Sequence, residues 1–293
     1  LAALFGGPGT LDTSLGGTGK VITPIGSGDD RGHAVARQSD GKLVVGGYSH
    51  NGTSKEFCVV RYNADGTLDS GFGTGGKAVT DFGAGTHDEI NALAVQPDGR
   101  IVTVGQAYNI SNGVTEIALA RYNADGTPDT GFGVTGTGRM KPAIGIVSGG
   151  TKANGVTLQP DGKIVIIGTA LPSPSRYTFV LLRYNSDGTL DNGFGTGGAV
   201  FIDFGTNVQG RDVLVQPDGR IVVTGHQDNN LALVARCNAD GSLDSSFGSG
   251  GKVVAAYSGL DIMTMSFGVA LQADDKIVLA GLSYTGDFAL MRL

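Results

Sequence analysis

The segment Gln96-Pro97-Asp98-Gly99-Arg100 decides the fold, because it is one of five similar segments in a chain of 293 residues. The others begin at Gln38, Gln159, Gln216 and Gln272, about 58 residues apart. Proline presets φ and glycine accepts a positive φ, so Pro-Asp-Gly favours a tight turn. Alternating apolar residues flank each copy, as at 92–95 and 164–168. Each copy therefore predicts a hairpin of two strands.

Two more strands follow each hairpin. The third is apolar and reaches an arginine, as in Ile117-Ala118-Leu119-Ala120-Arg121. A Gly-Thr-Leu-Asp phrase such as Gly66-Thr67-Leu68-Asp69 comes next, and then a short fourth strand such as residues 76–79. Four antiparallel strands in five copies predict an all-β, five-bladed β-propeller. No stretch shows a helical period, so residues 1–293 are expected to form a single propeller domain.

The two ends of the chain complement each other. The chain starts with Gly9-Thr10-Leu11-Asp12 and a candidate fourth strand at about 19–25, and it ends on a third strand at about 287–293. Pairing of these segments would complete the last blade and remove the exposed edges of an open array. We therefore expect the ring to close between the termini.

Composition excludes several classes of function. The net charge is −6 and the pI is about 5.1, which is unlike the basic surface of a nucleic-acid-binding protein. No apolar stretch approaches the ~18 residues that a membrane span needs. Cys58 and Cys237 are too few for a disulfide framework, and they fall in blades one and four, so both are predicted to be unpaired core thiols. We expect a monomer.

The Gly-Thr-Leu-Asp phrase followed by the Gln-Pro-Asp-Gly hairpin resembles the delta-60 repeat, a bacterial family of tandem repeats. The resemblance covers almost the whole chain, and the strand order is similar to that of NHL-type propellers. It implies a propeller in bacterial secreted or cell-surface proteins and supplies no catalytic residues. The last copy departs from the pattern at Ala273 and Asp275, which predicts a different local turn.

Residues present in every blade are interpreted as structural. The third-strand arginines are expected to pair with the aspartates of the Thr-Leu-Asp phrases, because Arg–Asp pairs are strong and directional when partly buried. The closing pair would be Arg292 with Asp12. These arginines are Arg61, Arg121, Arg183, Arg236 and Arg292.

Function is expected where the copies differ, at the mouth of the channel where the innermost strands begin. Five residues before each glutamine stand His33, Asn91, Asn154, Arg211 and Phe267. Seven residues before it stand Arg31, Glu89, Lys152, Gln209 and Met265. A concave mouth with convergent polar groups is a candidate binding site, whereas a solvated channel lining is the plainer interpretation. The whole cluster contains Arg31, His33, His87, Asp88, Glu89, Asn91, Lys152, Asn154, Arg211, Asp212 and His226.

Three functions remain open. A recognition module would bind a small ligand, glycan or protein at the mouth, with tyrosines stacking on sugars; the candidates are Tyr48, Tyr108, Tyr177 and Tyr284. A metal-assisted esterase or lactonase, by analogy with gluconolactonases on related propellers, would hold a divalent cation such as calcium. Its metal ligands would be Glu89, Asn154 and Asp212, with His33 or His226 as general base. The third function is a surface spacer.

Overall fold

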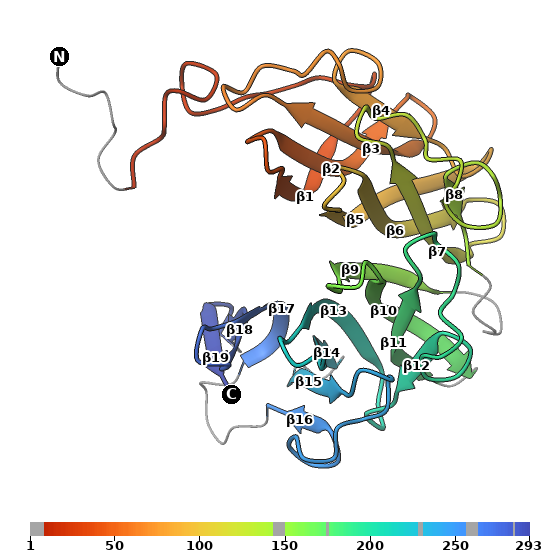
Figure 1. Cartoon of the computed structure of the whole chain (residues 1–293), viewed down its shortest axis with the longest axis vertical. Coiled ribbons are helices and arrows are strands. Elements are labelled where there is room, and N and C mark those ends of the chain that lie inside the picture. Colours follow the sequence, from red (N-terminus) through yellow and green to blue (C-terminus); the bar gives the residue numbers. More distant parts are fainter. Residues whose placement is uncertain (1–8, 143–149, 174–175, 228–230, 256–262, 284) are drawn as a thin grey trace.

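The computed structural model describes residues 9–142, 150–173, 176–227, 231–255, 263–283 and 285–293. Within these residues the regular structure is entirely β, arranged as five antiparallel sheets in chain order (Figure 1). The predicted five-bladed β-propeller is confirmed. None of the described residues forms a helix that could cross a membrane.

Each blade is one sheet whose strands follow one another in sequence. Blade one contains β1 (Arg31–Arg37), β2 (Leu43–His50), β3 (Lys55–Tyr62) and β4 (Lys77–Thr80). Blade two contains β5 (Thr86–Val95), β6 (Ile101–Asn109), β7 (Thr115–Tyr122) and β8 (Arg139–Met140). Blade three contains β9 (Lys152–Leu158), β10 (Ile164–Ser173), β11 (Arg176–Tyr184) and β12 (Ala199–Ile202). Blade four contains β13 (Val208–Val215), β14 (Ile221–Gln227), β15 (Leu231–Cys237) and β16 (Lys252–Val254), and blade five contains β17 (Met263–Leu271), β18 (Ile277–Ser283) and β19 (Phe288–Arg292).

The core lies between blades rather than inside them. The first strands of consecutive blades contact one another, so they are the innermost strands. The second and third strands are apolar on both faces, because neighbouring blades cover both faces. Ile164, Val165, Ile166 and Ile167 are all fully buried, although consecutive strand residues point to opposite sides. Both cysteines are free and buried, as predicted.

Every innermost strand carries a β-bulge at the same position. The extra residue, which has no partner on the second strand, is the one five places before the hairpin glutamine. Side chains along a strand point alternately to its two faces, and a bulge changes the direction of one of them. The bulge residues are His33, Asn91, Asn154, Arg211 and Phe267.

The expected closure between residues 19–25 and 287–293 is not formed. Blade five is a three-stranded sheet with β19 at its edge, and Figure 1 shows the described N-terminal segment along blade one, away from β19. Contacts to blade one hold that segment, because Tyr62 donates its hydroxyl to Thr23 Oγ1 at 2.8 Å and Lys77 Nζ donates to Pro24 O at 2.9 Å. The segment thus binds the following blade as a fourth strand does, but not the preceding blade.

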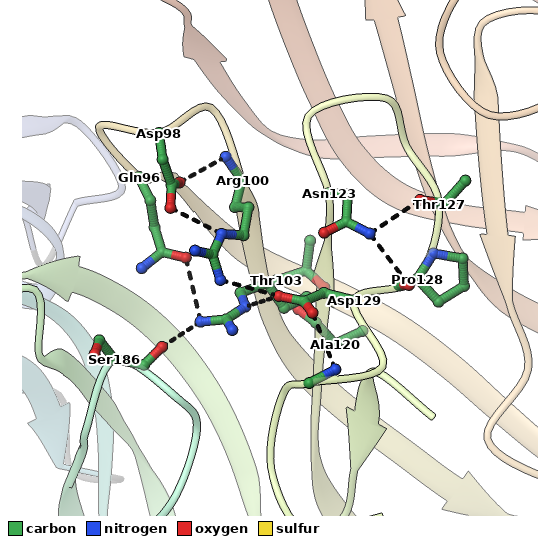
Figure 2. A network of polar contacts seen from close by, with 12 residues as sticks. Gln96, Asp98, Arg100, Thr103, Ala120, Asn123, Thr127, Pro128, Asp129 and Ser186 are labelled. Carbon is green, nitrogen blue, oxygen red and sulfur yellow. Dashed lines mark hydrogen bonds and ion pairs between the residues drawn. The ribbon is translucent and has the colours of Figure 1, made fainter. Parts of the chain in front are cut away.

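The predicted Arg–Asp pairs form in the first four blades. In blade two, Arg121 Nε donates to Asp129 Oδ2 at 2.8 Å, and Arg100 reaches the same oxygen at 3.2 Å (Figure 2). The Arg121 guanidinium also packs over the Phe132 ring, 4.5 Å from its centroid, and donates to Ser186 O of blade three. Equivalent bonds to the next blade come from Arg61 and Arg183. We call this arrangement the arginine staple, because it joins one blade to the next.

Blade five departs from this pattern in the described residues. No ion pair joins Arg292 to Asp12 there, and Asp12 instead accepts a hydrogen bond from Ser14 N at 2.9 Å. The different turn predicted for the last hairpin is not observed, because Asp275 adopts a positive φ of 61° where the other copies have a glycine with positive φ. The hydrogen bonds from Gln272 N to Lys276 O and from Asp275 N to Gln272 O also match those of the other copies.

Candidate functional site

A cavity of about 360 Å³ opens on the face where the innermost strands begin. The Pro-Asp-Gly turns and the arginine staples lie at the other end of the strands. Blades two, three and four all contribute to the cavity, which we call the mouth pocket. It is lined by Gln106, Thr115, Gly150, Lys152, Thr169, Tyr177, Val208 and Gln209.

Three of the predicted site residues instead connect neighbouring blades. The bulge residue Asn91 donates from Nδ2 to Ala153 O at 2.8 Å, and Asn154 donates to Gly210 O at 2.6 Å. The His33 Nδ1 lies 2.8 Å from Ile90 O, so this nitrogen carries a proton. In each case the acceptor is the carbonyl just before the next blade's bulge. These side chains therefore stabilise the contacts between consecutive innermost strands.

The fourth blade breaks this series. Arg211 occupies the bulge, but its Nη2 donates to Gln209 Oε1 at 3.1 Å, and Gln209 lines the mouth pocket. Its Nε is buried and has no hydrogen-bond partner among the described residues. Burial lowers the pKa of the Arg211 guanidinium. This arginine is therefore a half-buried cation at the pocket.

The junction between blades four and five is held by Asp212. Its Oδ2 accepts from Val269 N at 2.9 Å and its Oδ1 accepts from Val213 N at 2.8 Å. Burial raises the pKa of this carboxyl, and both oxygens already accept a backbone hydrogen bond.

Lys152 begins β9 and lines the pocket. Burial lowers the pKa of its ammonium, and the nearby Arg211 adds to the lowering. Lys152 makes no salt bridge with any described residue. Lys55 shows the contrast, because its ion pair with Glu89 raises its pKa.

The acidic candidates have structural partners. Glu89 pairs with Lys55 and accepts from Gln106 Nε2 at 3.4 Å. Asp88 is fully buried and accepts from Phe82 N at 2.8 Å, which fixes the segment leading into β5. Burial raises the pKa of Asp88 to about 6. Among the described residues, no three His, Cys, Asp or Glu side chains are grouped to hold a metal ion.

The aromatic candidates are distributed over the same face. His87 Nδ1 accepts from Lys55 N at 3.1 Å and its ring stacks on Tyr108, with centroids 6.5 Å apart. Tyr48 is buried under Lys55 Nζ, which lies 4.3 Å from its ring centroid.

The remaining candidates lie apart from that stack. His226 is buried with its ring 6.3 Å from Phe267. Arg31 lines a separate cavity of about 110 Å³ beside Tyr48. Tyr177 reaches the mouth pocket, while Tyr284 lies outside the described residues.

Three lining residues, Thr115, Gly150 and Val208, were missed by the sequence reasoning. Thr115 begins a third strand, whereas most of the predicted site residues belong to first strands or to the ends of second strands. The signal was available, since Thr115 is the register partner of Tyr108, a residue already selected from the neighbouring strand.

The chain is similar to several solved structures at low sequence identity. Solved structures with similar folds include the GH43 endo-arabinanase from Bacillus licheniformis (11% identity, 92% of this chain and 95% of that chain, TM-score 0.43). Others are a gluconolactonase from Xanthomonas campestris (15%, 88% and 70%, TM-score 0.47) and the Penicillium chrysogenum α-L-arabinanase (11%, 89% and 74%, TM-score 0.49). No curated protein matches the sequence.

The family model of the DUF5122 β-propeller, a domain of unknown function, matches residues 38–72, 96–132, 159–194 and 216–247. These ranges contain the hairpin turn, the second and third strands and the Thr-Leu-Asp or equivalent phrase of blades one to four. Blades one to four of this β-propeller therefore carry repeats of the DUF5122 family, the same type of repeat as the delta-60 repeat.

Proposed function

We infer that this chain is a recognition module that binds a small polar ligand in the mouth pocket. The observation that carries this inference is a cavity of about 360 Å³ lined by polar side chains from three blades. Its volume lies in the range of small-molecule sites, and such sites combine a concave wall with a few fixed polar groups. A rigid propeller meets this need because neighbouring blades fix each lining strand.

Binding is favoured over hydrolysis by the partners of the predicted metal ligands. Asn154 donates to a blade-four carbonyl, Asp212 accepts two backbone amides, and Glu89 is paired with Lys55. Both carboxylates thus already have partners, and no three His, Cys, Asp or Glu side chains among the described residues are grouped to hold a metal ion. A spacer, in turn, has no need of a cavity that contains uncompensated charge. Location at the bacterial cell surface or outside the cell is part of this proposal and rests on the repeat resemblance.

A pocket-filling variant tests the proposal. Thr115→Trp places an indole in the pocket, and Thr74→Trp, on an exposed turn, is the matched control. The wild type and the control should bind a ligand from a panel of sugars, sugar acids and sugar phosphates, as measured by calorimetry, whereas Thr115→Trp should not. Equal binding by a folded Thr115→Trp protein would place the site elsewhere, and a wild type that binds no member of the panel would contradict the proposal.

A further inference from the structure

The charges near the mouth pocket are not balanced. The chain is acidic overall, with a net charge of −6. On this face Lys55 pairs with Glu89, Lys141 pairs with Glu116 at 2.8 Å, and Arg31 is exposed to solvent. Lys152 and Arg211 differ because they are half-buried and neither makes an ion pair with any described residue.

Burial makes this imbalance costly. Both cations are half-buried, and burial lowers the pKa of each. A cation taken out of water without a partner loses hydration that nothing replaces. The negative charge of Glu89 acts to raise the pKa of Lys152, but the Glu89 carboxylate is already paired with Lys55. Asp212, next to Arg211, has both oxygens on backbone amides. The described residues therefore supply no free counter-charge to these two cations.

Both cations are connected to the mouth pocket. Lys152 lines the pocket directly, and Arg211 is attached to its wall through Gln209. Thr169, the register partner of Lys152, also lines the pocket. The Thr169 side chain is 97% buried, because only 3% of its surface is exposed, and its hydroxyl has no hydrogen-bond partner among the described residues. Lys152 and an unsatisfied hydroxyl donor thus line the pocket, and the Arg211 guanidinium is bound to Gln209, which forms part of its wall.

The bulge position of blade four departs from the repeat, although the Arg211 guanidinium still lies 5.8 Å from the ring centroid of Phe267 in blade five. His33, Asn91 and Asn154 each connect their blade to the next from the bulge. At the fourth junction Asp212 makes the connection instead, and the guanidinium turns to Gln209 on the pocket wall. A larger cavity of about 500 Å³ at the opposite end also contains arginines, but Asp98 and Asp129 neutralise Arg100 and Arg121 there.

We propose that the mouth pocket takes its ligand by an oxyanion, a carboxylate or a phosphate, held between Lys152 and Arg211. This inference rests on the proposed function, since it names the chemical class of the ligand. The oxyanion supplies the missing counter-charge and accepts hydrogen bonds from the ammonium, the guanidinium and the Thr169 hydroxyl. Charge-assisted bonds of this kind are stronger than neutral ones, and the neutral lining is left to contact the rest of the ligand.

The experiment measures binding of glucuronate, galacturonate, glucose 6-phosphate and neutral glucose by calorimetry. The variants are Lys152→Met, Arg211→Gln and the control Lys20→Met, which removes an exposed cation outside the pocket. Wild type and Lys20→Met should bind at least one anionic sugar better than glucose. Each pocket variant should lose about tenfold or more in affinity for that sugar, the usual effect of removing a charged hydrogen-bond partner. The uronate and phosphate arms decide which oxyanion is preferred.

Two outcomes separate this inference from the proposed function. If glucose binds as tightly as the anionic sugars and both pocket variants bind normally, the oxyanion inference fails while the pocket remains a binding site. If wild type binds none of the four probes, the oxyanion inference fails, and the wider panel of sugars, sugar acids and sugar phosphates decides the proposed function. Because Arg211→Gln could disturb the bulge, Arg211→Lys is measured beside it. Recovery of affinity by this variant, with unchanged circular dichroism, supports a charge role, and no recovery with loss of the fold assigns Arg211 a structural role instead.

Discussion

At the scale of single residues, Asp88 is an ionisable side chain buried in the core. It is fully buried, and its Oδ2 accepts the Phe82 amide. Burial raises its pKa from 3.8 to about 6, against the lowering effect of hydrogen bonds from Phe82 and Thr86. Between these two pH values the folded protein binds a proton that the unfolded chain has lost, so stability falls as pH rises through this window. Ionised Asp88 therefore destabilises the fold at neutral pH.

We predict that Asp88→Asn is stabilising above about pH 7, and that the gain disappears near pH 4, where Asp88 is already protonated. The full shift to about 6 corresponds to roughly 3 kcal/mol at most. Asparagine can still accept the Phe82 amide. Urea unfolding at the two pH values measures the difference, with the exposed Asp29→Asn as control. A gain of equal size at both pH values would show that ionisation is not the cause.

At the scale of elements, the β-bulge of each innermost strand determines where the side chain of its extra residue points. Asn91 is the extra residue of β5, and its amide reaches Ala153 O of blade three at 2.8 Å.

We predict that Asn91→Ala costs about 1–2 kcal/mol in the free energy of unfolding, because a part-buried carbonyl loses its donor. Asn91→Asp should cost more, since an ionised carboxylate cannot donate. Chemical unfolding measures both, with exposed Asn192→Ala as control; a neutral Asn91→Ala would show that this bond does not stabilise the junction.

The sequence predicts these elements unevenly. Hairpins and strands follow from the Pro-Asp-Gly turns and the apolar alternation, which are local. The sequence also places Asn154 near the start of a strand. Its bulge, however, depends on how β9 pairs with β10. The carbonyl that accepts the Asn154 hydrogen bond belongs to Gly210 of another blade. Local pattern cannot show whether an amide faces a ligand or a neighbouring carbonyl. The same limit applies to Asp88, whose carboxylate turns to the Phe82 amide.

At the scale of the whole molecule, stability depends on the contacts between consecutive blades. In the first three blades the arginine staple crosses each junction, from Arg61 to Ala124 O, from Arg121 to Ser186 O and from Arg183 to Ala239 O. An array in which each unit contacts its neighbours gains much of its stability from such junctions. The last unit differs, because β19 is an edge strand with Phe288 and Leu290 exposed.

This difference gives a comparison within one chain. Arg121→Lys keeps the charge but loses the planar fork that reaches Asp129 and Ser186 O together. It also loses the guanidinium packed on Phe132. We predict a cost of about 2 kcal/mol in the free energy of unfolding, because a buried carbonyl and part of a buried ion pair lose their donor. Arg292→Lys makes the same change at the equivalent position of blade five, where the described residues hold no such ion pair, so it should alter stability by no more than about 0.5 kcal/mol. Urea unfolding of both variants measures the contrast. If Arg292→Lys costs as much stability as Arg121→Lys, the prediction is wrong. Arg292 would then have to pair with a carboxylate in solution.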